Sequence, residues 1–144
     1  MTIWFDMDGT VADLYGVTDW LTDILNAETR PYEVAKGIGN LALIARLLNK
    51  VKASGHEIGI ISWTAKNGTA EYNKAVETAK RAWLARHLPS VEWNEIKVVE
   101  YGTNKYMTCG GGILFDDEEP NRQTWGKGAY TPAEIVKVLK AMTK

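Results

Sequence analysis

Short apolar runs alternate along the chain with longer stretches in which apolar residues recur at helical spacing. The runs predict four β-strands and a brief fifth, at residues 3–6, 58–61, 96–99, 112–115 and 129–130. The first run is almost entirely apolar, which is typical of a strand covered on both faces. This alternation predicts the α/β class, with a doubly wound parallel, Rossmann-like sheet flanked by helices.

The stretches between the runs carry start and stop signals for helices. One helix begins after Asn40 and ends at Gly55, because asparagine caps helix N-termini and glycine follows their C-termini. A long helix follows the cap at Thr69 and ends before Pro89, which cannot continue it. The last helix begins at residues 131–134, where Thr-Pro-Ala-Glu forms a capping box with proline at the first helical position.

Residues 14–39 form the least regular part of the chain. Apolar residues recur at helical spacing after Thr18, the predicted N-cap, so a short helix is expected to begin near Trp20. Residues 30–39 contain one proline and two glycines, and this composition predicts a loop.

The composition limits the class of protein. The 144 residues, of which 45% are hydrophobic and 24% charged, suit one globular domain. A net charge of −1 excludes the polycationic surface that is typical of nucleic-acid and membrane binding. Cys109, the one cysteine, cannot form an intramolecular disulfide, and no run is long enough to span a bilayer. We expect a cytoplasmic protein without a signal peptide or a membrane partner.

Two carboxylates follow the first predicted strand, in the segment Phe5-Asp6-Met7-Asp8-Gly9-Thr10-Val11-Ala12-Asp13. Displacement at phosphorus needs a nucleophile, a proton donor for the leaving oxygen and groups that neutralise the phosphoryl oxygens. Asp6, at the strand end, is the candidate nucleophile and would form an aspartyl-phosphate, and Asp8 is the candidate general acid and base. Gly9 lets the main chain approach closely, so backbone N–H groups at Gly9 and Thr10 are candidate phosphate ligands.

Two hydroxyl residues follow the second predicted strand, in Ser62-Trp63-Thr64. A hydroxyl at a strand end can donate a hydrogen bond to a phosphate oxygen. The register leaves both Ser62 and Thr64 as candidates, and Ser62 is preferred because the apolar run ends just before it. Trp63 and Trp20 are candidate aromatic contacts to a substrate, since aromatic rings stack on nucleotide bases.

The last two segments supply a cation and more carboxylates. Lys105 lies between the third and fourth predicted strands, where it can keep neighbouring carboxylates ionised and balance the charge of a phosphate. Lys97 is the alternative, but it lies within a strand and should point away. Asp116 and Asp117 follow the fourth strand. Oxygens of Asp6 and Asp116, with a main-chain carbonyl and waters, would form an octahedral site suited to Mg²⁺.

These four segments, in this order and over nearly the whole chain, resemble the motifs of the haloacid dehalogenase-like (HAD) superfamily of phosphotransferases. The resemblance implies that Asp6 is the nucleophile and a metal ligand. It also implies that Asp8 is the general acid and base and binds the metal through its backbone carbonyl. The remaining implied roles are phosphate binding for Ser62 and Lys105 and Mg²⁺ binding for Asp116, with Asp117 close behind.

Within the superfamily the chain resembles the 5′(3′)-deoxyribonucleotidase branch. The resemblance lies in residues 6–13 (DMDGTVAD), in residues 80–88 (KRAWLARHL) and in the spacing from the lysine to the Asp-Asp pair. Those enzymes carry a substantial helical cap between the first two motifs, whereas residues 14–39 leave room only for a small cap-like insert in a single domain of residues 1–144. The implied activity is that of a Mg²⁺-dependent phosphomonoesterase for a nucleotide or another small phosphorylated metabolite.

Two alternatives remain open from the sequence. A small insert leaves the site accessible to a larger substrate, such as the 3′- or 5′-phosphorylated end of a nucleic acid. The chain could instead be a non-catalytic binding or regulatory module with the same fold. The presence of both aspartates of the first segment, Ser62, Lys105 and the Asp116-Asp117 pair favours an enzyme.

Overall fold

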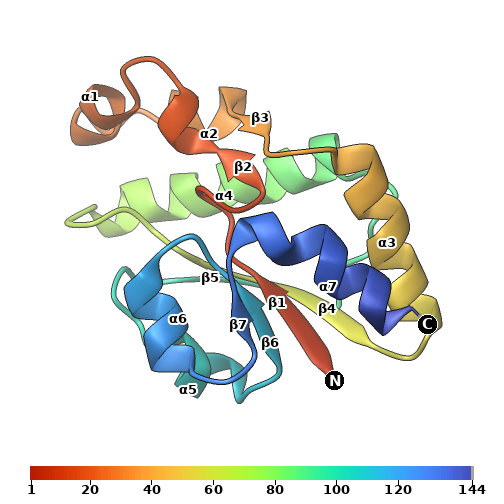
Figure 1. Ribbon diagram of the computed structural model, residues 1–144. Coiled ribbons are helices and arrows are strands. Elements are labelled where there is room, and N and C mark those ends of the chain that lie inside the picture. Colours follow the sequence, from red (N-terminus) through yellow and green to blue (C-terminus); the bar gives the residue numbers. More distant parts are fainter. Residues whose placement is uncertain (144) are drawn as a thin grey trace.

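A five-stranded parallel sheet forms the centre of the computed structural model, which describes residues 1–143 (Figure 1). The strand order is β5-β4-β1-β6-β7, and every neighbouring pair is parallel. The strands are β1 (Thr2–Phe5), β4 (Glu57–Trp63), β5 (Glu95–Val99), β6 (Ile113–Phe115) and β7 (Ala129–Tyr130). The chain order of the strands reverses at β1, so the predicted doubly wound parallel sheet is confirmed, with the brief fifth strand at its edge.

The strand register brings two chain segments to the same end of the sheet. Phe5, the last residue of β1, pairs with Phe115, the last residue of β6. The residues that follow therefore leave the sheet side by side, and the N–H of Asp6 donates to the carbonyl of Phe115 at 2.9 Å. On the other side of β1, β4 pairs Ile60 with Phe5 and continues for three more residues.

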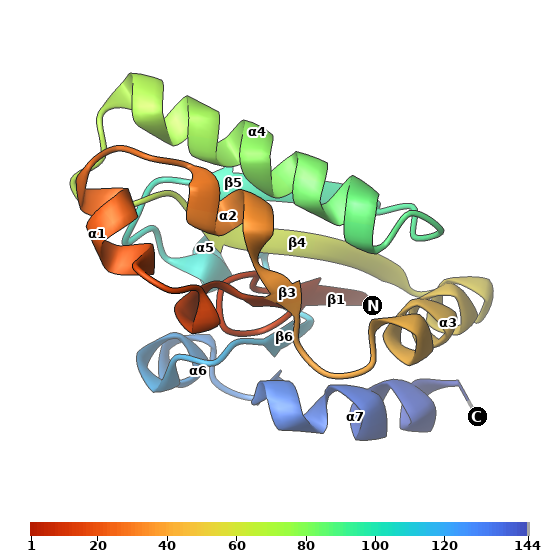
Figure 2. The ribbon, with the colours of Figure 1, turned by 90° about the horizontal axis from the view of Figure 1, so that it is seen from above.

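Helices cover both faces of the sheet. Alternate strand residues point to opposite faces, and here both faces carry apolar side chains that need to be covered. Ile3 and Phe5 belong to the larger apolar core, whereas Trp4 belongs to a smaller core on the opposite face. The larger core lies beneath α3 (Leu41–Ala53), α4 (Ala70–His87) and α7 (Ile135–Met142). The short helices α5 (Lys105–Cys109) and α6 (Glu119–Trp125) lie on the other side (Figure 2).

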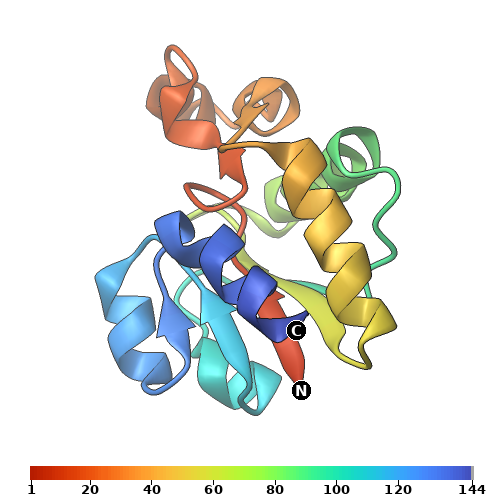
Figure 3. The same ribbon diagram turned by 45° about the vertical axis from the view of Figure 1, so that its right-hand side comes forward.

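Residues 14–39, here called the insert, lie beyond the carboxyl end of β1 (Figure 3). The insert contains η1 (Leu14–Gly16), α1 (Trp20–Leu25), α2 (Arg30–Val34) and β3 (Lys36–Gly37). An antiparallel pair between β3 and β2 (Ala12–Asp13) closes its base. The two ends of the insert are therefore held together next to the main sheet.

The insert is attached along α4. Apolar contacts join Leu14 and Tyr32 of the insert to Tyr72 and Val76 of the helix. Three backbone carbonyls of the insert also accept hydrogen bonds from α4: Glu28 from Tyr72 Oη at 2.7 Å, Ala35 from Trp83 Nε1 at 2.8 Å and Glu33 from Arg86 at 2.6 Å. These contacts fix the insert as a wall at the carboxyl end of the sheet.

The predicted N-caps of the longer helices α3 and α4 are confirmed. Asn40 accepts a hydrogen bond from the N–H of Leu43, and Thr69 accepts one from Tyr72, as expected of N-caps. The capping box after β7 begins a 3₁₀ turn, η2 (Pro132–Glu134), that leads into α7. No helix within residues 1–143 combines the length and apolar character that crossing a bilayer requires.

In the insert the predicted short helix is confirmed, since α1 begins at Trp20, but two details were wrong. The residue before α1 is Asp19, at φ +63° and without a side-chain cap, so Thr18 is not the N-cap. Residues 30–34 form α2 and not a loop. Pro31 is compatible with that helix because the first turn does not need its missing N–H.

Candidate active site

Three carboxylates meet at the carboxyl ends of β1 and β6. Asp6 follows β1, and Asp116 and Asp117 follow β6. One oxygen of each side chain lies within 4.8 Å of an oxygen of each of the other two. Mg²⁺ prefers carboxylate oxygens, so this donor set fits a divalent cation. Within residues 1–143 the carboxylate of Asp8 lies outside the cluster, and its predicted metal contact would involve the backbone carbonyl alone.

Lys105 balances part of this negative charge. It is the first residue of α5, and Asn104 caps that helix by accepting a hydrogen bond from the N–H of Met107 at 3.0 Å. Lys105 Nζ donates to Asp6 Oδ1 at 3.0 Å and to Asp116 Oδ2 at 2.7 Å. Burial alone would lower the pKa of Lys105, but the two carboxylates more than offset that effect and raise the pKa above its ordinary value. Lys105 is therefore a fixed positive charge next to Asp6.

The cluster still carries more negative charge than one lysine balances. Burial, reinforced by the charge of Asp6, raises the pKa of Asp116 to about 6, although Lys105 acts in the opposite direction. Burial and the charge of Asp6 also raise the pKa of Asp117 to about 8. A bound divalent cation would favour the ionised form of both groups, as expected of a metal site.

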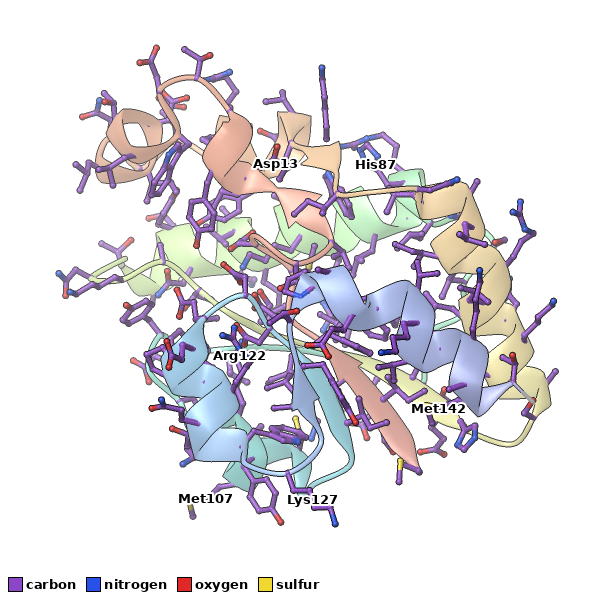
Figure 4. The ribbon with its side chains drawn as sticks, viewed as in Figure 1. Asp13, His87, Met107, Arg122, Lys127 and Met142 are labelled. Atoms are coloured by element: carbon purple, nitrogen blue, oxygen red, sulfur yellow. The ribbon has the colours of Figure 1, made fainter. Side chains whose placement is uncertain are left out.

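The beginning of α6 holds Asp116 in place. The backbone N–H of Glu118 donates to Asp116 Oδ1 at 2.9 Å, and Asn121 Nδ2 donates to Oδ2 at 3.2 Å. Arg122, labelled in Figure 4, donates to the backbone carbonyl of Asp116 at 3.0 Å. Asp116 is completely buried and satisfied on both oxygens, so its position is strongly defined.

The turn after β1 uses Gly9 and Thr10 differently from the prediction. The N–H of Gly9 donates to Ala12 and that of Thr10 to Met7, so both groups are engaged within the turn and not directed at a ligand. The Thr10 hydroxyl lies 3.2 Å from Asp6 Oδ2 and 3.3 Å from Asp117 Oδ1. Thr10 therefore links two members of the carboxylate cluster.

Lys80 is a site residue that the sequence motifs did not predict. It projects from α4, is only 1% exposed, and its Nζ donates to Asp8 Oδ2 at 2.9 Å. The same Nζ donates to Ser62 Oγ and to the carbonyl of Trp63, both at 2.7 Å. Burial raises the pKa of Asp8, although Lys80 acts in the opposite direction. A lysine on the apolar face of a helix, between Val76 and Trp83, was the available signal.

The two candidate hydroxyls have different surroundings. Ser62 is fully buried and its hydroxyl accepts the hydrogen bond from Lys80, whereas Thr64 lines the cavity next to Asp6 and Asp8. Thr64 Oγ1 is buried and has no hydrogen-bond partner within residues 1–143. Such groups are rare in folded proteins, so the Thr64 hydroxyl retains an unused capacity to donate a hydrogen bond. Ser62 and Thr64 both stay candidates for the phosphate-binding hydroxyl, and they differ in that only the Ser62 hydroxyl is already engaged by Lys80.

A cavity of about 410 Å³ lies between the strand ends and the insert. Asp6, Asp8 and Lys105 form its charged floor. The predicted aromatic residues Trp63 and Trp20 both line its walls, each in an edge-to-face pair with a tyrosine at 4.9 Å between ring centroids. The cavity therefore places ring-binding surfaces around a polar floor. The tyrosines of these pairs are Tyr15 and Tyr101.

Lys97 remains outside the site, as expected. Its Nζ donates to the carbonyl of Thr108 at 3.1 Å and lies 5.4 Å from the ring of Trp4, on the face covered by α5 and α6. Of the two lysines considered from the sequence, only Lys105 contacts the carboxylate cluster.

The fold and the position of this site place the chain among parallel α/β proteins with an acidic site at the strand ends. The fold is similar to that of a solved structure, the crystal structure of D,D-heptose 1,7-bisphosphate phosphatase from Burkholderia thailandensis. It is 9% identical in sequence with a TM-score of 0.55, over 97% of this chain and 96% of that chain. No protein-family model and no curated protein matches the chain.

Proposed function

We propose that the protein is a HAD-type, Mg²⁺-dependent phosphomonoesterase that forms an aspartyl-phosphate at Asp6. The observation that carries this proposal is the convergence of Asp6, Asp116 and Asp117 around Lys105, next to the separately held Asp8. The fold shared with a phosphatase is consistent with it. A structural role alone does not account for three clustered carboxylates of which one, Asp6, lines a cavity.

The reaction has two steps, in which Asp6 is the nucleophile and Asp8 acts first as the general acid and then as the general base. A carboxylate oxygen of Asp6 attacks phosphorus, the ester P–O bond breaks, and Asp8 donates its proton to the leaving oxygen. Asp8, now ionised, then takes a proton from a water molecule that attacks the phosphorus of the aspartyl-phosphate. This step releases inorganic phosphate and regenerates Asp6.

Other groups hold the phosphate during both steps. Lys105 balances its charge, and the hydroxyl of Thr64 donates to a non-bridging oxygen. The backbone N–H groups of Met7 and Asp8 have no partner within residues 1–143. They would donate to the phosphate oxygens in place of the N–H groups of Gly9 and Thr10. Mg²⁺, when bound by Asp6, Asp116 and Asp117, would neutralise phosphoryl oxygens as a Lewis acid.

A nucleotide is the substrate that the cavity suits best. Its volume of about 410 Å³ is within the range of small-molecule sites, and the rings of Trp20 and Trp63 can contact a base. The insert would then act as a small, fixed cap that contacts the part of the substrate beyond the phosphate. A net charge of −1 does not favour a long nucleic-acid substrate.

A phosphate-release screen tests this proposal. The substrates are 4-nitrophenyl phosphate, nucleoside 5′- and 3′-monophosphates, sugar phosphates and phosphorylated oligonucleotides, each with Mg²⁺ and with excess EDTA. The expected result is EDTA-sensitive release with highest kcat/KM for nucleotides and little salt dependence. Preference for oligonucleotides that weakens steeply with salt would replace the nucleotide by a nucleic-acid end. Absence of metal-dependent release from every ester would instead favour a non-catalytic module.

A further inference from the structure

The packing of α4 against its neighbours does not require a buried lysine at position 80. Its side chain is 1% exposed and lies on the helix face that carries Val76 and Trp83. Removing an ammonium group from water is costly, and well-packed apolar residues often replace buried ion pairs without loss of stability. The position of this lysine is therefore better explained by what its ammonium group contacts.

All three protons of the ammonium group have an acceptor. Asp8 Oδ2 lies at 2.9 Å, Ser62 Oγ at 2.7 Å and the carbonyl of Trp63 at 2.7 Å. The ring of Tyr32 from the insert lies 5.2 Å from Nζ and completes the enclosure by a cation–π contact. Lys80 thus connects the turn after β1 to the end of β4 and to the insert.

The contact with Lys80 makes the two oxygens of Asp8 different. Oδ2 accepts a hydrogen bond from the ammonium group of Lys80, and this contact disfavours protonation of Oδ2 itself. Oδ1 forms no hydrogen bond within residues 1–143, and Asp8 lines the cavity. We propose that Lys80 is a positioning residue that holds Asp8 by Oδ2, so that Oδ1 carries the proton exchanged with the leaving group. This inference rests on the proposed phosphatase function.

The test uses leaving groups of different basicity. The ester 4-nitrophenyl phosphate has a stable leaving group that needs little protonation, whereas 4-methylphenyl phosphate has nearly the same shape and a more basic leaving oxygen. Lys80→Met should lower kcat/KM for 4-methylphenyl phosphate by about 100-fold, within the range for lost acid catalysis, and for 4-nitrophenyl phosphate by less than about 5-fold. Lys74→Met, an exposed lysine on the same helix, should change neither value.

A double mutant separates positioning from general stability. If Lys80 acts through Asp8, adding Lys80→Met to Asp8→Asn should cause no further loss with 4-methylphenyl phosphate. Lys80→Gln provides a second variant, because it keeps a neutral donor if the methionine variant does not fold. Circular dichroism and thermal unfolding verify that each variant is folded.

Equal losses with the two esters, or additive losses in the double mutant, would show that Lys80 does not act through Asp8. Those outcomes leave the phosphatase proposal intact, because they require an active wild-type protein. A wild-type protein that releases phosphate from neither ester would overturn both the phosphatase proposal and this inference.

Discussion

The Asp117 carboxylate, at the end of β6, occupies the space that a side chain at Gly9, in the turn after β1, would fill. A Cβ atom at position 9 would overlap Asp117 Oδ2 and lie 2.6 Å from its Cγ. Gly9 also has φ +81°, which side chains other than glycine rarely adopt. Glycine at this position therefore allows the Asp117 carboxylate to join the carboxylate cluster.

Gly9→Ala should consequently damage the metal site more than the fold. We expect a loss of stability of about 1–3 kcal/mol from the strained backbone, together with a displaced Asp117 carboxylate and a fall of at least about 10-fold in Mg²⁺ affinity. Mg²⁺-dependent shifts in melting temperature measure that affinity. Gly55→Ala is the matched control, since Gly55 has φ +97° and nothing within 4 Å of an added Cβ. An unchanged Mg²⁺ response in Gly9→Ala would show that Asp117 does not contribute to binding.

Asp6→Asn should abolish turnover and leave the protein folded. An amide cannot attack phosphorus, and it binds Mg²⁺ less tightly than a carboxylate. We expect phosphate release to fall by at least about 10⁴-fold, comparable with losses of other catalytic nucleophiles. Mass spectrometry of the wild-type protein quenched in acid during turnover should detect a phosphorylated form that Asp6→Asn lacks. Turnover by Asp6→Asn at the wild-type rate would exclude a covalent intermediate at this residue.

Thr64→Val should weaken phosphate binding without lowering stability. Among the described residues the hydroxyl has no partner, so its removal costs no hydrogen bond there and should leave the melting temperature unchanged or raised. Loss of a hydrogen bond to a charged ligand costs about 1.5–3 kcal/mol, which corresponds to about 10- to 150-fold in the inhibition constant of inorganic phosphate. If Thr64→Val loses stability and binds phosphate normally, Ser62 becomes the stronger candidate again.

The stability of the metal-free protein should fall as pH rises. Burial and the charge of Asp6 raise the pKa of Asp116 to about 6 and that of Asp117 to about 8, whereas an unfolded aspartate titrates near about 4. Above that lower value the unfolded chain loses protons that the folded protein keeps. The contribution of these groups is therefore fully present below about pH 4 and is lost as pH rises through the folded pKa values.

Thermal unfolding with and without Mg²⁺ measures this effect. The melting temperature of the metal-free protein should decrease between about pH 5 and about pH 8, and Mg²⁺ should raise it more at the higher pH, where protons no longer compete. Asp117→Asn should show a smaller decrease because it removes the group with the higher pKa. A metal-free protein whose stability does not depend on pH over this interval would contradict the raised pKa values.

The fold was more predictable than the details of the site. Strand positions follow from short apolar runs, and the register of a parallel sheet then brings Asp6 and Asp116 together. Lys80 was missed because it contacts Asp8 across 72 residues of sequence, and a helix pattern does not show which strand end its apolar face meets. The choice between Ser62 and Thr64 likewise depends on the side-chain direction at the end of β4, which the apolar run does not determine.

Trp20 tests whether the insert contributes to substrate choice. Its ring lines the cavity from α1 in an edge-to-face pair with Tyr15, whereas the residues proposed to bind the phosphate lie at the strand ends. Stacking on an aromatic ring is worth about 1–3 kcal/mol per base, so Trp20→Ala should raise KM for a nucleotide by about 5- to 150-fold. Acetyl phosphate, which has no ring, should be hydrolysed at the wild-type kcat/KM.

Leu21→Ala is the control for this prediction, because Leu21 lies on the same helix and also lines the cavity but has no ring. It should change KM for the nucleotide by less than Trp20→Ala does. Equal losses with acetyl phosphate and the nucleotide would mean that Trp20 supports the insert and does not contact a base. In that case the substrate would be selected by the strand ends, where Trp63 and Tyr101 form the other aromatic pair.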